Sequence, residues 1–564
     1  MFFLSMLIFA ALSLKFHLIF RIPINGDEFS YLSLVYKFIN GSSLSYHNTF
    51  HVHFFSWLRF LNQNEVIQII CARMVMFLLF VGTCTYLFLI GRYYLDKTSS
   101  LFSVLCYISF VFSVVNGGSF RHDTIATFLY LLALYFFIAK KGSITFNAIA
   151  GIAMSAAFVF TIKSAIHLTV FGVFILARLL YFNKLRETIK PISGFILAFF
   201  FGVLIINKFH VASFSGESLE HQVQAAISIY STFVMFDQLF PQFAIFKALL
   251  GADWLIWIFL TAGIILYFCD FLKTQRINKN ICMIVLLLPL FSLLFYRNAF
   301  PYFYVFVMPT ATLFCGFMFK KLTEIFKIKN QMICLLILVI FSGAVFKNFV
   351  TYYSAFSHKQ ISGQKQTIDV IHRMFPKPVA YFDCCFVVSS YPDMGFFLSS
   401  VGMEIYLKTG QPVMEKLLNT KKPLFLLANV PHLNLHSEVP ASLYTDLTFK
   451  TEDWQALKSY FIHHWGPIWV VGKRFEFKSE NEKQKFKIDV PGIYTLEGNQ
   501  NVLIDGSLIR AGDIITLETG QHIIRNEETI GVISLKWGDH LYQPSKEPLI
   551  KCFFIGKVLE EKRY

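Results

Sequence analysis

The chain contains 564 residues, of which 55% are hydrophobic and only 15% are charged. An ordinary soluble domain carries about a quarter charged residues, so this composition excludes a purely soluble enzyme and an intrinsically disordered chain. The formal net charge of +15 would suit a nucleic-acid partner, but residues 1–350 carry a net charge of +14 and residues 351–564 only +1. The excess therefore lies in the apolar part of the chain, where charge reports membrane orientation, and we expect no nucleic-acid partner.

Long apolar stretches predict about eleven transmembrane helices, because a helix needs roughly 20 mostly apolar residues to span a bilayer. These stretches lie at 3–20, 66–90, 99–115, 124–139, 144–160, 165–182, 192–206, 254–272, 281–296, 302–319 and 331–349. Charges inside them are rare, with Lys15 and Arg73 as the strongest internal cations. The sequence therefore predicts a polytopic α-helical membrane protein.

The segments between the apolar stretches alternate in charge. Five of them are basic and carry Arg92 and Lys97, Lys140 and Lys141, Lys184, Arg186 and Lys190, Lys273, Arg276 and Lys279, and Lys320, Lys321, Lys327 and Lys329. The positive-inside rule places these segments and the N-terminus in the cytoplasm. The opposite set is then exoplasmic: 21–65, 116–123, 161–164, 207–253, 297–301 and everything after residue 350. We expect a multi-pass plasma membrane protein, in a bacterial inner membrane, with its C-terminal domains outside.

The first exoplasmic segment begins with two adjacent carboxylates, Asp27 and Glu28. Ionisable groups at the depth of the membrane interface are costly and usually functional, although Asp27 also suits a helix cap. Residues 29–39, which include Tyr31, repeat apolar side chains at helical spacing, and a second such patch follows His51 and His53. Both patches predict amphipathic helices that lie along the outer interface.

Three later exoplasmic segments carry further polar residues. Residues 116–123 contain Arg121 and Asp123, and residues 161–164 contain Lys163, which departs from the positive-inside trend. The segment after the ninth stretch contains Arg297, followed by Tyr302 and Tyr304 and then by Met308-Pro309. Helix capping by Asp123, interfacial anchoring by Lys163 and an aromatic belt for the tyrosines are the structural interpretations. Binding of an anionic group by the cations is the functional one.

The order of these motifs resembles the GT-C class of membrane glycosyltransferases, and most of all the branch of protein O-mannosyltransferases and lipid A aminoarabinose transferases. The resemblance covers residues 1–350 and rests mainly on the Asp-Glu pair directly after the first span. The chain departs from the usual pattern of that branch, which has His-Tyr before the proline of the third motif; here the residues are Phe300-Pro301-Tyr302. The resemblance implies a polyprenyl-phosphate-linked sugar as donor and transfer on the exoplasmic face.

The chemistry of such a transfer assigns roles to these residues. The anionic phosphate of a lipid donor needs cations at the interface, for which Lys163, Arg297 and Arg121 are the candidates. The acceptor hydroxyl needs a carboxylate base, for which we choose Asp27, with Glu28 or Asp123 orienting it. A single displacement opposite the leaving group would invert the anomeric centre. Further candidate contacts to donor or acceptor are Tyr31, His53, Tyr302 and Tyr304.

The sequence requires no cofactor. Asp27, Glu28 and Asp123 are carboxylates able to bind a divalent metal, whereas the resemblance implies an enzyme that needs none, so metal dependence stays open. The sugar also stays open, as does the acceptor, for which the alternatives are a lipid, a glycan or a protein.

Residues 351–564 predict two exoplasmic domains. Strand-like runs at 378–382, 423–428 and 469–472 alternate with helical stretches at 410–419 and 452–464, which is typical of an α/β domain over 351–480. Short strands separated by glycine turns predict a small β-sandwich over 481–564. This module either binds glycan or braces the rest of the protein.

Two other functions share parts of this pattern. A transporter or flippase of lipid-linked saccharides would place charges at the membrane midplane on broken helices, whereas here the charges gather at the outer interface. A polysaccharide polymerase or ligase shares the donor class, and Glu217, Glu220 and His221 in the 207–253 segment keep it open.

Overall fold

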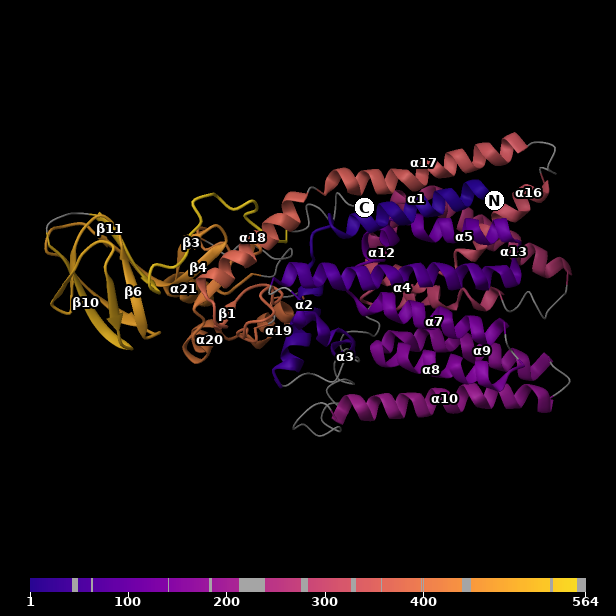
Figure 1. Cartoon of the computed structure of the whole chain (residues 1–564), viewed down its shortest axis with the longest axis horizontal. Helices are drawn as coiled ribbons and strands as arrows, with labels where there is room; N and C mark the ends of the chain where they lie inside the picture. The colour runs from indigo at the N-terminus through magenta and orange to yellow at the C-terminus, as the bar shows by residue number, and fades with distance from the viewer. Residues whose placement is uncertain are drawn as a thin grey trace.

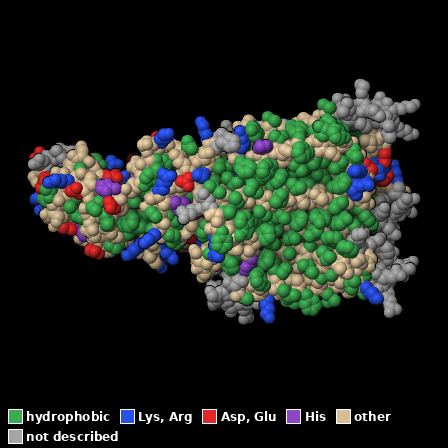
Figure 2. Space-filling model, in the orientation of Figure 1, with side chains coloured by type: hydrophobic (Ala, Val, Ile, Leu, Met, Phe, Trp, Pro, Cys, Tyr) green, Lys and Arg blue, Asp and Glu red, His purple; other side chains and the backbone are tan. Residues whose placement is uncertain are grey.

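The computed structural model describes residues 1–42, 49–61, 64–139, 142–181, 185–212, 239–274, 283–325, 331–356, 358–396, 398, 400–438, 448–527 and 531–554. Figure 1 shows a bundle of long helices at one end of the molecule and a strand-rich part at the other. Helix α18 (His358–Met374) leads from the bundle into the strand-rich part. Hydrophobic side chains cover the visible face of the bundle, while charged ones gather over the strand-rich part and at the ends of the bundle (Figure 2).

Six described helices contain stretches long and apolar enough to cross a membrane. They are α1 (Phe2–Ile19), α4 (Glu65–Tyr94), α7 (His122–Ala139), α9 (Ala165–Tyr181), α10 (Leu185–Ala212) and α13 (Trp254–Thr274). Further helices of the bundle are α5 (Lys97–Ser109), α6 (Val111–Asn116), α8 (Ile144–Phe160), α12 (Phe243–Ala252), α15 (Pro301–Val307), α16 (Leu313–Ile325) and α17 (Gln331–Ala355). The chain is therefore a polytopic α-helical protein, as its sequence predicts.

The predicted apolar stretches all overlap helices, but their number as membrane spans stays a prediction. The stretch at 99–115 is divided between α5 and α6 at Phe110, whose backbone is extended (φ −56°, ψ 136°). The stretch at 302–319 is divided between α15 and α16 around Pro309, which cannot donate a helical hydrogen bond. The stretch at 281–296 lies partly outside the described residues and contains the 3₁₀ helix η3 (Leu288–Leu294).

The predicted loop at 207–253 differs from the structure at both ends. Helix α10 continues to Ala212, and the ten-residue helix α12 occupies most of the other end. The apolar residues of α12 form a helix that is too short to span a bilayer.

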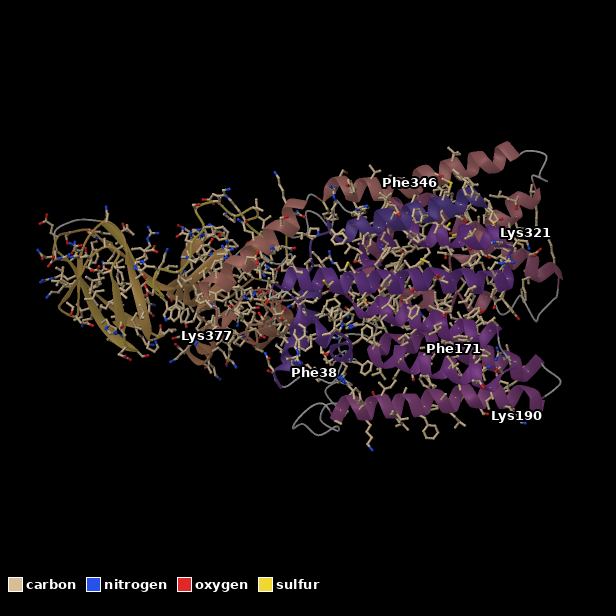
Figure 3. The ribbon with its side chains drawn as sticks, in the orientation of Figure 1. Phe38, Phe171, Lys190, Lys321, Phe346 and Lys377 are labelled. Atoms are coloured by element: carbon tan, nitrogen blue, oxygen red, sulfur yellow. The ribbon has the colours of Figure 1, made fainter. Side chains whose placement is uncertain are left out.

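The two ends of the bundle differ in the residues they carry. Lys190 of α10 and Lys321 of α16, both from predicted cytoplasmic segments, lie at the end away from the strand-rich part (Figure 3). Phe38, near the end of α2 (Gly26–Ile39), lies at the opposite end. Helices α2 and α3 (His51–Phe55) lie across that end of the bundle, as expected for helices that follow the interface (Figure 1).

Two sheets form the strand-rich part. The larger has the order β1-β2-β4-β11-β6-β9, with β3 paired to β4, and the smaller has the order β5-β10-β7-β8. The larger contains β1 (Tyr381–Phe382), β2 (Phe425–Leu427), β3 (Phe461–Trp465), β4 (Ile468–Phe477), β6 (Gly492–Glu497), β9 (Ile514–Leu517) and β11 (Gly531–Trp537). The smaller contains β5 (Lys483–Ile488), β7 (Val502–Ile504), β8 (Ser507–Ile509) and β10 (Gly520–Asn526). Side chains from both sheets share one hydrophobic core, which gives a β-sandwich.

Strand β4 joins the two predicted exoplasmic domains. Its first residues pair with β2, and residues 472–477 pair with β11. Three helices cover this region: α19 (Ser400–Thr409), α20 (Met414–Lys421) and α21 (Thr451–Tyr460). The predicted helix at 452–464 ends at Tyr460 because the aromatic and β-branched run Phe461–Trp465 pairs with β4 instead. The division at residue 480 stays a prediction.

A polar junction attaches α18 to the bundle. The side-chain amide of Gln364 donates to the carbonyl of Ile24 at 2.9 Å and accepts from its N–H at 3.1 Å. At the start of α4, the fully buried Glu65 contacts the His372 imidazole at 3.0 Å and accepts from the Ser390 hydroxyl at 2.6 Å. These contacts fix the strand-rich part over the end of the bundle that carries α2.

The Glu65–His372 contact makes this junction sensitive to pH. Burial alone would lower the pKa of His372, but the hydrogen bond and the charge of Glu65 raise it above its usual value. A raised pKa means that the stabilisation is complete below about pH 6.5 and is lost as the pH rises through the folded-state pKa. We therefore expect the melting temperatures of the wild type and of His372→Gln to converge between pH 5.5 and pH 8.5, measured by thermal unfolding in lipid nanodiscs. A difference that stays constant over this range would contradict the assignment.

Candidate functional site

The first turn of α2 presents the two adjacent carboxylates. The Asn25 side chain accepts from the N–H of Glu28 at 3.1 Å, and the Glu28 carboxylate accepts from the N–H of Asn25 at 3.1 Å. This reciprocal capping box fixes the start of the helix, and a carboxylate there is favoured by the helix dipole. Asp27 and Glu28, as neighbours on a helix, then point in different directions and meet different surroundings.

Glu28 is fully buried in an ion pair with Arg73 of α4. The guanidinium donates to both carboxylate oxygens, at 2.8 and 2.5 Å. The same carboxylate accepts from the N–H of Phe120 at 2.8 Å, so it also holds the segment between α6 and α7. Arg73 further donates to the carbonyls of Ile19, Ile22 and Pro23 at 2.7–3.0 Å, which fixes the end of α1.

Asp27 belongs to a second group of charges, here called the ion cluster: Asp27, Arg121, Asp123 and Lys163. The Arg121 guanidinium donates to the Asp27 carboxylate and lies 3.4 Å from the Asp123 carboxylate. The Lys163 ammonium, from the 3₁₀ helix η2 (Ile162–Ser164), donates to the other oxygen of Asp123 at 2.9 Å. Three of the predicted exoplasmic segments thus meet in one cluster with two positive and two negative charges.

The members of the ion cluster differ sharply in exposure. The Asp27 side chain is 58% exposed, whereas those of Arg121, Asp123 and Lys163 are 6%, 2% and 13% exposed. Asp123 therefore joins the two cations beneath the surface, and Asp27 is the carboxylate of the cluster that an incoming molecule can reach.

Two tyrosines line the cation side of the cluster. The Tyr302 ring centroid lies 3.6 Å from the Arg121 guanidinium carbon and 5.0 Å from the Lys163 nitrogen, both within cation–π range. Tyr31 of α2 packs edge-on against the ring of His122 at 4.3 Å, and its centroid lies 5.8 Å from Arg121. Burial raises the pKa of Tyr31, so its hydroxyl stays protonated and can donate a hydrogen bond.

The other predicted site residues lie outside the contacts of the ion cluster described above. His53 faces His210 at the end of α10, with 2.9 Å between ring nitrogens, and burial lowers its pKa. Tyr304 is fully buried and packs against Phe112 of α6 at 5.6 Å. Arg297 lies in the segment before α15, partly exposed, where its carbonyl accepts from the Gln242 side chain at 2.7 Å. Glu217, Glu220 and His221 lie outside the described residues.

Sequence reasoning missed the residues that fix the segment carrying Arg121. The short helix α6 precedes this segment and is held at both ends by buried ionisable side chains. The Asp253 carboxylate accepts from the N–H of Val111 at 2.8 Å, and the Lys15 ammonium donates to the carbonyls of Ser113 and Val114. A carboxyl group at the first turn and an amino group at the last thus bind the backbone at the two ends of this helix. Lys15 and Arg73 were recognisable as costly charges inside apolar stretches, but the sequence did not reveal their partners.

Among the residues that the structure describes, no three His, Cys, Asp or Glu side chains are grouped to hold a metal ion. Asp27 and Asp123 share Arg121, and Glu28 is engaged by Arg73. Metal dependence stays open.

Comparison with solved structures identifies the fold. The archaeal oligosaccharyltransferase AglB from Archaeoglobus fulgidus, in complex with an inhibitory peptide and a dolichol-phosphate, is 10% identical over 97% of both chains, with a TM-score of 0.52. ArnT from Cupriavidus metallidurans, bound to undecaprenyl phosphate, is 13% identical over 75% of this chain and 92% of that chain, with a TM-score of 0.54. Both are GT-C glycosyltransferases. The chain has the GT-C fold.

The resemblance seen in the sequence is thereby confirmed for the fold. The apo form of the Archaeoglobus fulgidus oligosaccharyltransferase gives a similar result, with 9% identity over 96% of this chain and 98% of that chain and a TM-score of 0.51. No protein-family model and no curated protein sequence matches the chain. At 9–13% identity the similarity shows the fold alone.

Substitution of the buried Glu28 tests its structural role. Glu28→Gln leaves Arg73 buried without its counter-charge, and breaking a buried pair in this way costs about 3–5 kcal/mol. We expect a clear fall in melting temperature for the purified protein in nanodiscs. Glu324→Gln is the matched control, because Glu324 pairs with Lys321 at the surface and is 50% exposed, where a pair contributes about 0–1 kcal/mol. Equal melting temperatures for the two variants would contradict the structural role of Glu28.

Proposed function

We propose that the protein transfers a sugar from a polyprenyl-phosphate donor to an acceptor hydroxyl on the exoplasmic side of the membrane, with Asp27 as the base. The observation that carries the proposal is the exposed Asp27 carboxylate at the edge of a buried, charge-balanced cluster on a GT-C fold. The dolichol-phosphate and undecaprenyl phosphate bound to the two similar proteins support a lipid phosphate as the donor class.

The exoplasmic side follows from the distribution of charge. The labelled basic residues Lys190 and Lys321 lie at the end of the bundle opposite α2 (Figure 3). The positive-inside rule favours the cytoplasm for their end, which supports an outer position for Asp27 and the strand-rich part. This arrangement supports a plasma membrane protein whose reaction takes place on the outer surface.

The cations of the site suit the leaving group. The ion cluster has two positive and two negative side chains, so its charges cancel. A donor phosphate bound beside it adds negative charge and therefore requires a further cation. Arg297, in the partly exposed segment before α15, is our choice for that cation, because a guanidinium can form two parallel hydrogen bonds with a phosphate. Lys163 and Arg121 lie beneath the surface against the Tyr302 ring, so in this proposal they act on the phosphate by their charge rather than by direct contact.

The proposed reaction is a single displacement. The acceptor hydroxyl oxygen forms a bond to the anomeric carbon of the sugar while its proton passes to the Asp27 carboxylate. The bond between the anomeric carbon and the phosphate oxygen breaks, and the polyprenyl phosphate leaves with both electrons. Attack opposite the leaving group inverts the anomeric centre. Arg121, held by Asp123, orients Asp27 for this role.

Loss of the proposed base is expected to stop transfer without unfolding the protein. Asp27→Asn keeps the shape of an exposed side chain but removes its basicity, so we expect transfer from radiolabelled polyprenyl-phosphate sugars to fall about 10²–10⁴-fold. The melting temperature should fall less than that of Glu28→Gln, because the Asp27 side chain is 58% exposed and the buried Arg121 keeps Asp123 as a counter-charge. Asp505→Asn, at a 48% exposed carboxylate of the sandwich, is the control that retains activity. Full transfer by Asp27→Asn would rule out Asp27 as the base. Movement of intact lipid-linked sugar, with no cleavage of its phosphate bond, would rule out a glycosyl-transfer function.

Removal of the proposed phosphate ligand is expected to weaken donor binding. A hydrogen bond to a charged group contributes about 1.5–3 kcal/mol, so Arg297→Met should raise the apparent KM for the lipid donor roughly tenfold or more. Lys247→Met is the matched control, because Lys247 is an exposed lysine on the neighbouring helix α12. An unchanged KM for Arg297→Met would remove Arg297 from the site.

A further inference from the structure

Three cysteines follow residue 350, namely Cys384, Cys385 and Cys552, and two of them are adjacent in the chain. Cys384 and Cys385 come directly after Asp383 at the end of β1, a strand on the side of the strand-rich part that faces the bundle (Figure 1). All three are free thiols, and the Sγ atoms of Cys384 and Cys385 lie 3.1 Å apart. A disulfide bond is about 2.05 Å long, so a shift of roughly 1 Å would close a bond between these two neighbours.

The backbone around the pair is held in an uncommon conformation. Cys385 and Phe386 both have positive φ, at 73° and 60°, a region that residues other than glycine rarely adopt. The buried Asp383 carboxylate accepts from two N–H groups of this turn, at 3.0 and 2.7 Å. The buried Asn429 amide binds the N–H and the carbonyl of Cys384, at 3.0 and 2.7 Å. Such a conformation persists only where the surroundings fix it, and here they keep the two thiols side by side.

Cys385 also touches the first turn of α2. A β-carbon added to Gly26 would lie only 2.5 Å from the Cys385 Sγ, so this close approach requires a glycine. The Ser30 hydroxyl lies within hydrogen-bond distance of the carbonyls of Gly26 and Cys385, at 2.9 and 3.3 Å. Gly26 is the residue before Asp27. A movement of the Cys385 sulfur therefore changes the packing at the start of α2.

The two thiols differ in their surroundings. Cys384 is only 5% exposed, whereas Cys385 is partly exposed. The hydrogen bond with Cys385, together with burial, raises the pKa of the Cys384 thiol. Because the thiolate is the form that attacks a disulfide, Cys385 is the residue that meets an external oxidant first. Cys384 then closes the bond.

We propose that Cys384 and Cys385 form a reversible disulfide with each other, and that its formation changes the packing of the first turn of α2. The Cys385 sulfur first bonds to one sulfur of a disulfide oxidant, whose other sulfur leaves as a thiol. The Cys384 sulfur then bonds to the Cys385 sulfur, gives up its proton and displaces the second thiol. Two protein thiols are thereby oxidised, and the disulfide of the oxidant is reduced to two thiols.

The adjacency of the two residues makes the bond easy to reverse. Neighbouring Cα atoms lie about 3.8 Å apart, which is less than the range of about 4.4–6.8 Å that ordinary disulfides span. A disulfide between neighbours is therefore strained, and strained disulfides are readily reduced. In the proposed orientation the pair faces the exoplasm, where disulfides form and persist, and the proposal rests on the proposed function in this respect alone.

Mass spectrometry of the full-length protein tests the bond. The protein is reconstituted in lipid nanodiscs, equilibrated in glutathione buffers from fully reduced to fully oxidised, denatured in the presence of N-ethylmaleimide and digested. We expect the peptide that contains both cysteines to lose the label at both positions together as oxidised glutathione increases, and to regain both labels after dithiothreitol. Retention of both labels at every ratio would overturn the proposal, as would a bond to Cys552 or a lasting glutathione adduct in place of the internal bond.

Hydrogen exchange of the same samples tests the link to α2. Peptides that cover residues 24–34 should exchange at different rates in the reduced and the oxidised wild type. Equal exchange of these residues in the two states would contradict the coupling. Neither readout involves sugar transfer, so both results are independent of the role of Asp27.

Two variants serve as controls. Cys385→Ser cannot form the bond, so its residues 24–34 should exchange equally in reduced and oxidised buffer. Cys552→Ser removes the other thiol of this region, which donates to the carbonyl of Asn429 at 3.0 Å, but keeps the adjacent pair; it should behave as the wild type does. Melting temperatures identify any variant that has unfolded, and the comparison of reduced with oxidised wild type does not depend on either variant.

Discussion

The buried pair of Glu28 and Arg73 is the interaction on which the arrangement of the site depends. One guanidinium binds the end of α1, and one carboxylate binds both that guanidinium and the backbone before α7. The pair therefore joins α1, α2, α4 and the segment that carries Arg121. Within apolar surroundings neither charge is tolerable alone, so the two residues fix one geometry. Asp27, the next residue on α2, is left facing outward over the ion cluster.

The sequence predicted the neighbourhood of the site better than the roles within it. An Asp-Glu pair after the first span, Arg121-x-Asp123 and Lys163 were all recognisable because charges at the interface are costly, and three of these segments meet in space. Adjacent residues on a helix differ by about 100° in direction, and the pattern alone could not say which carboxylate is buried. Nor could it show that the Tyr302 ring lies against Arg121. Contacts between segments distant in sequence decide such points.

For the fold, too, the sequence located the elements better than the long-range contacts between them. Apolar stretches located the helices, because burial in lipid needs continuous hydrophobic length. The break at Phe110 was not predicted; there the distant Asp253 carboxylate accepts from the N–H of Val111. In the strand-rich part, the sharing of β4 by two groups of strands followed from long-range pairing. The internal cations Lys15 and Arg73, which would mark a transport pathway if unpaired, bind backbone carbonyls and Glu28 instead. This pairing favours a structural role for both.

The central claim is that Asp27 faces the reacting carbon of a lipid-linked sugar at the outer face of the bundle. The most direct measurement is a cryo-EM structure of the protein in a nanodisc with a non-hydrolysable polyprenyl-phosphonate sugar. We expect the phosphonate beside Arg297, with the anomeric carbon turned toward Asp27 and space between them for an acceptor hydroxyl within about 3 Å of the carboxylate. A phosphonate bound at the opposite end of the bundle, or an anomeric carbon turned away from Asp27, would contradict it.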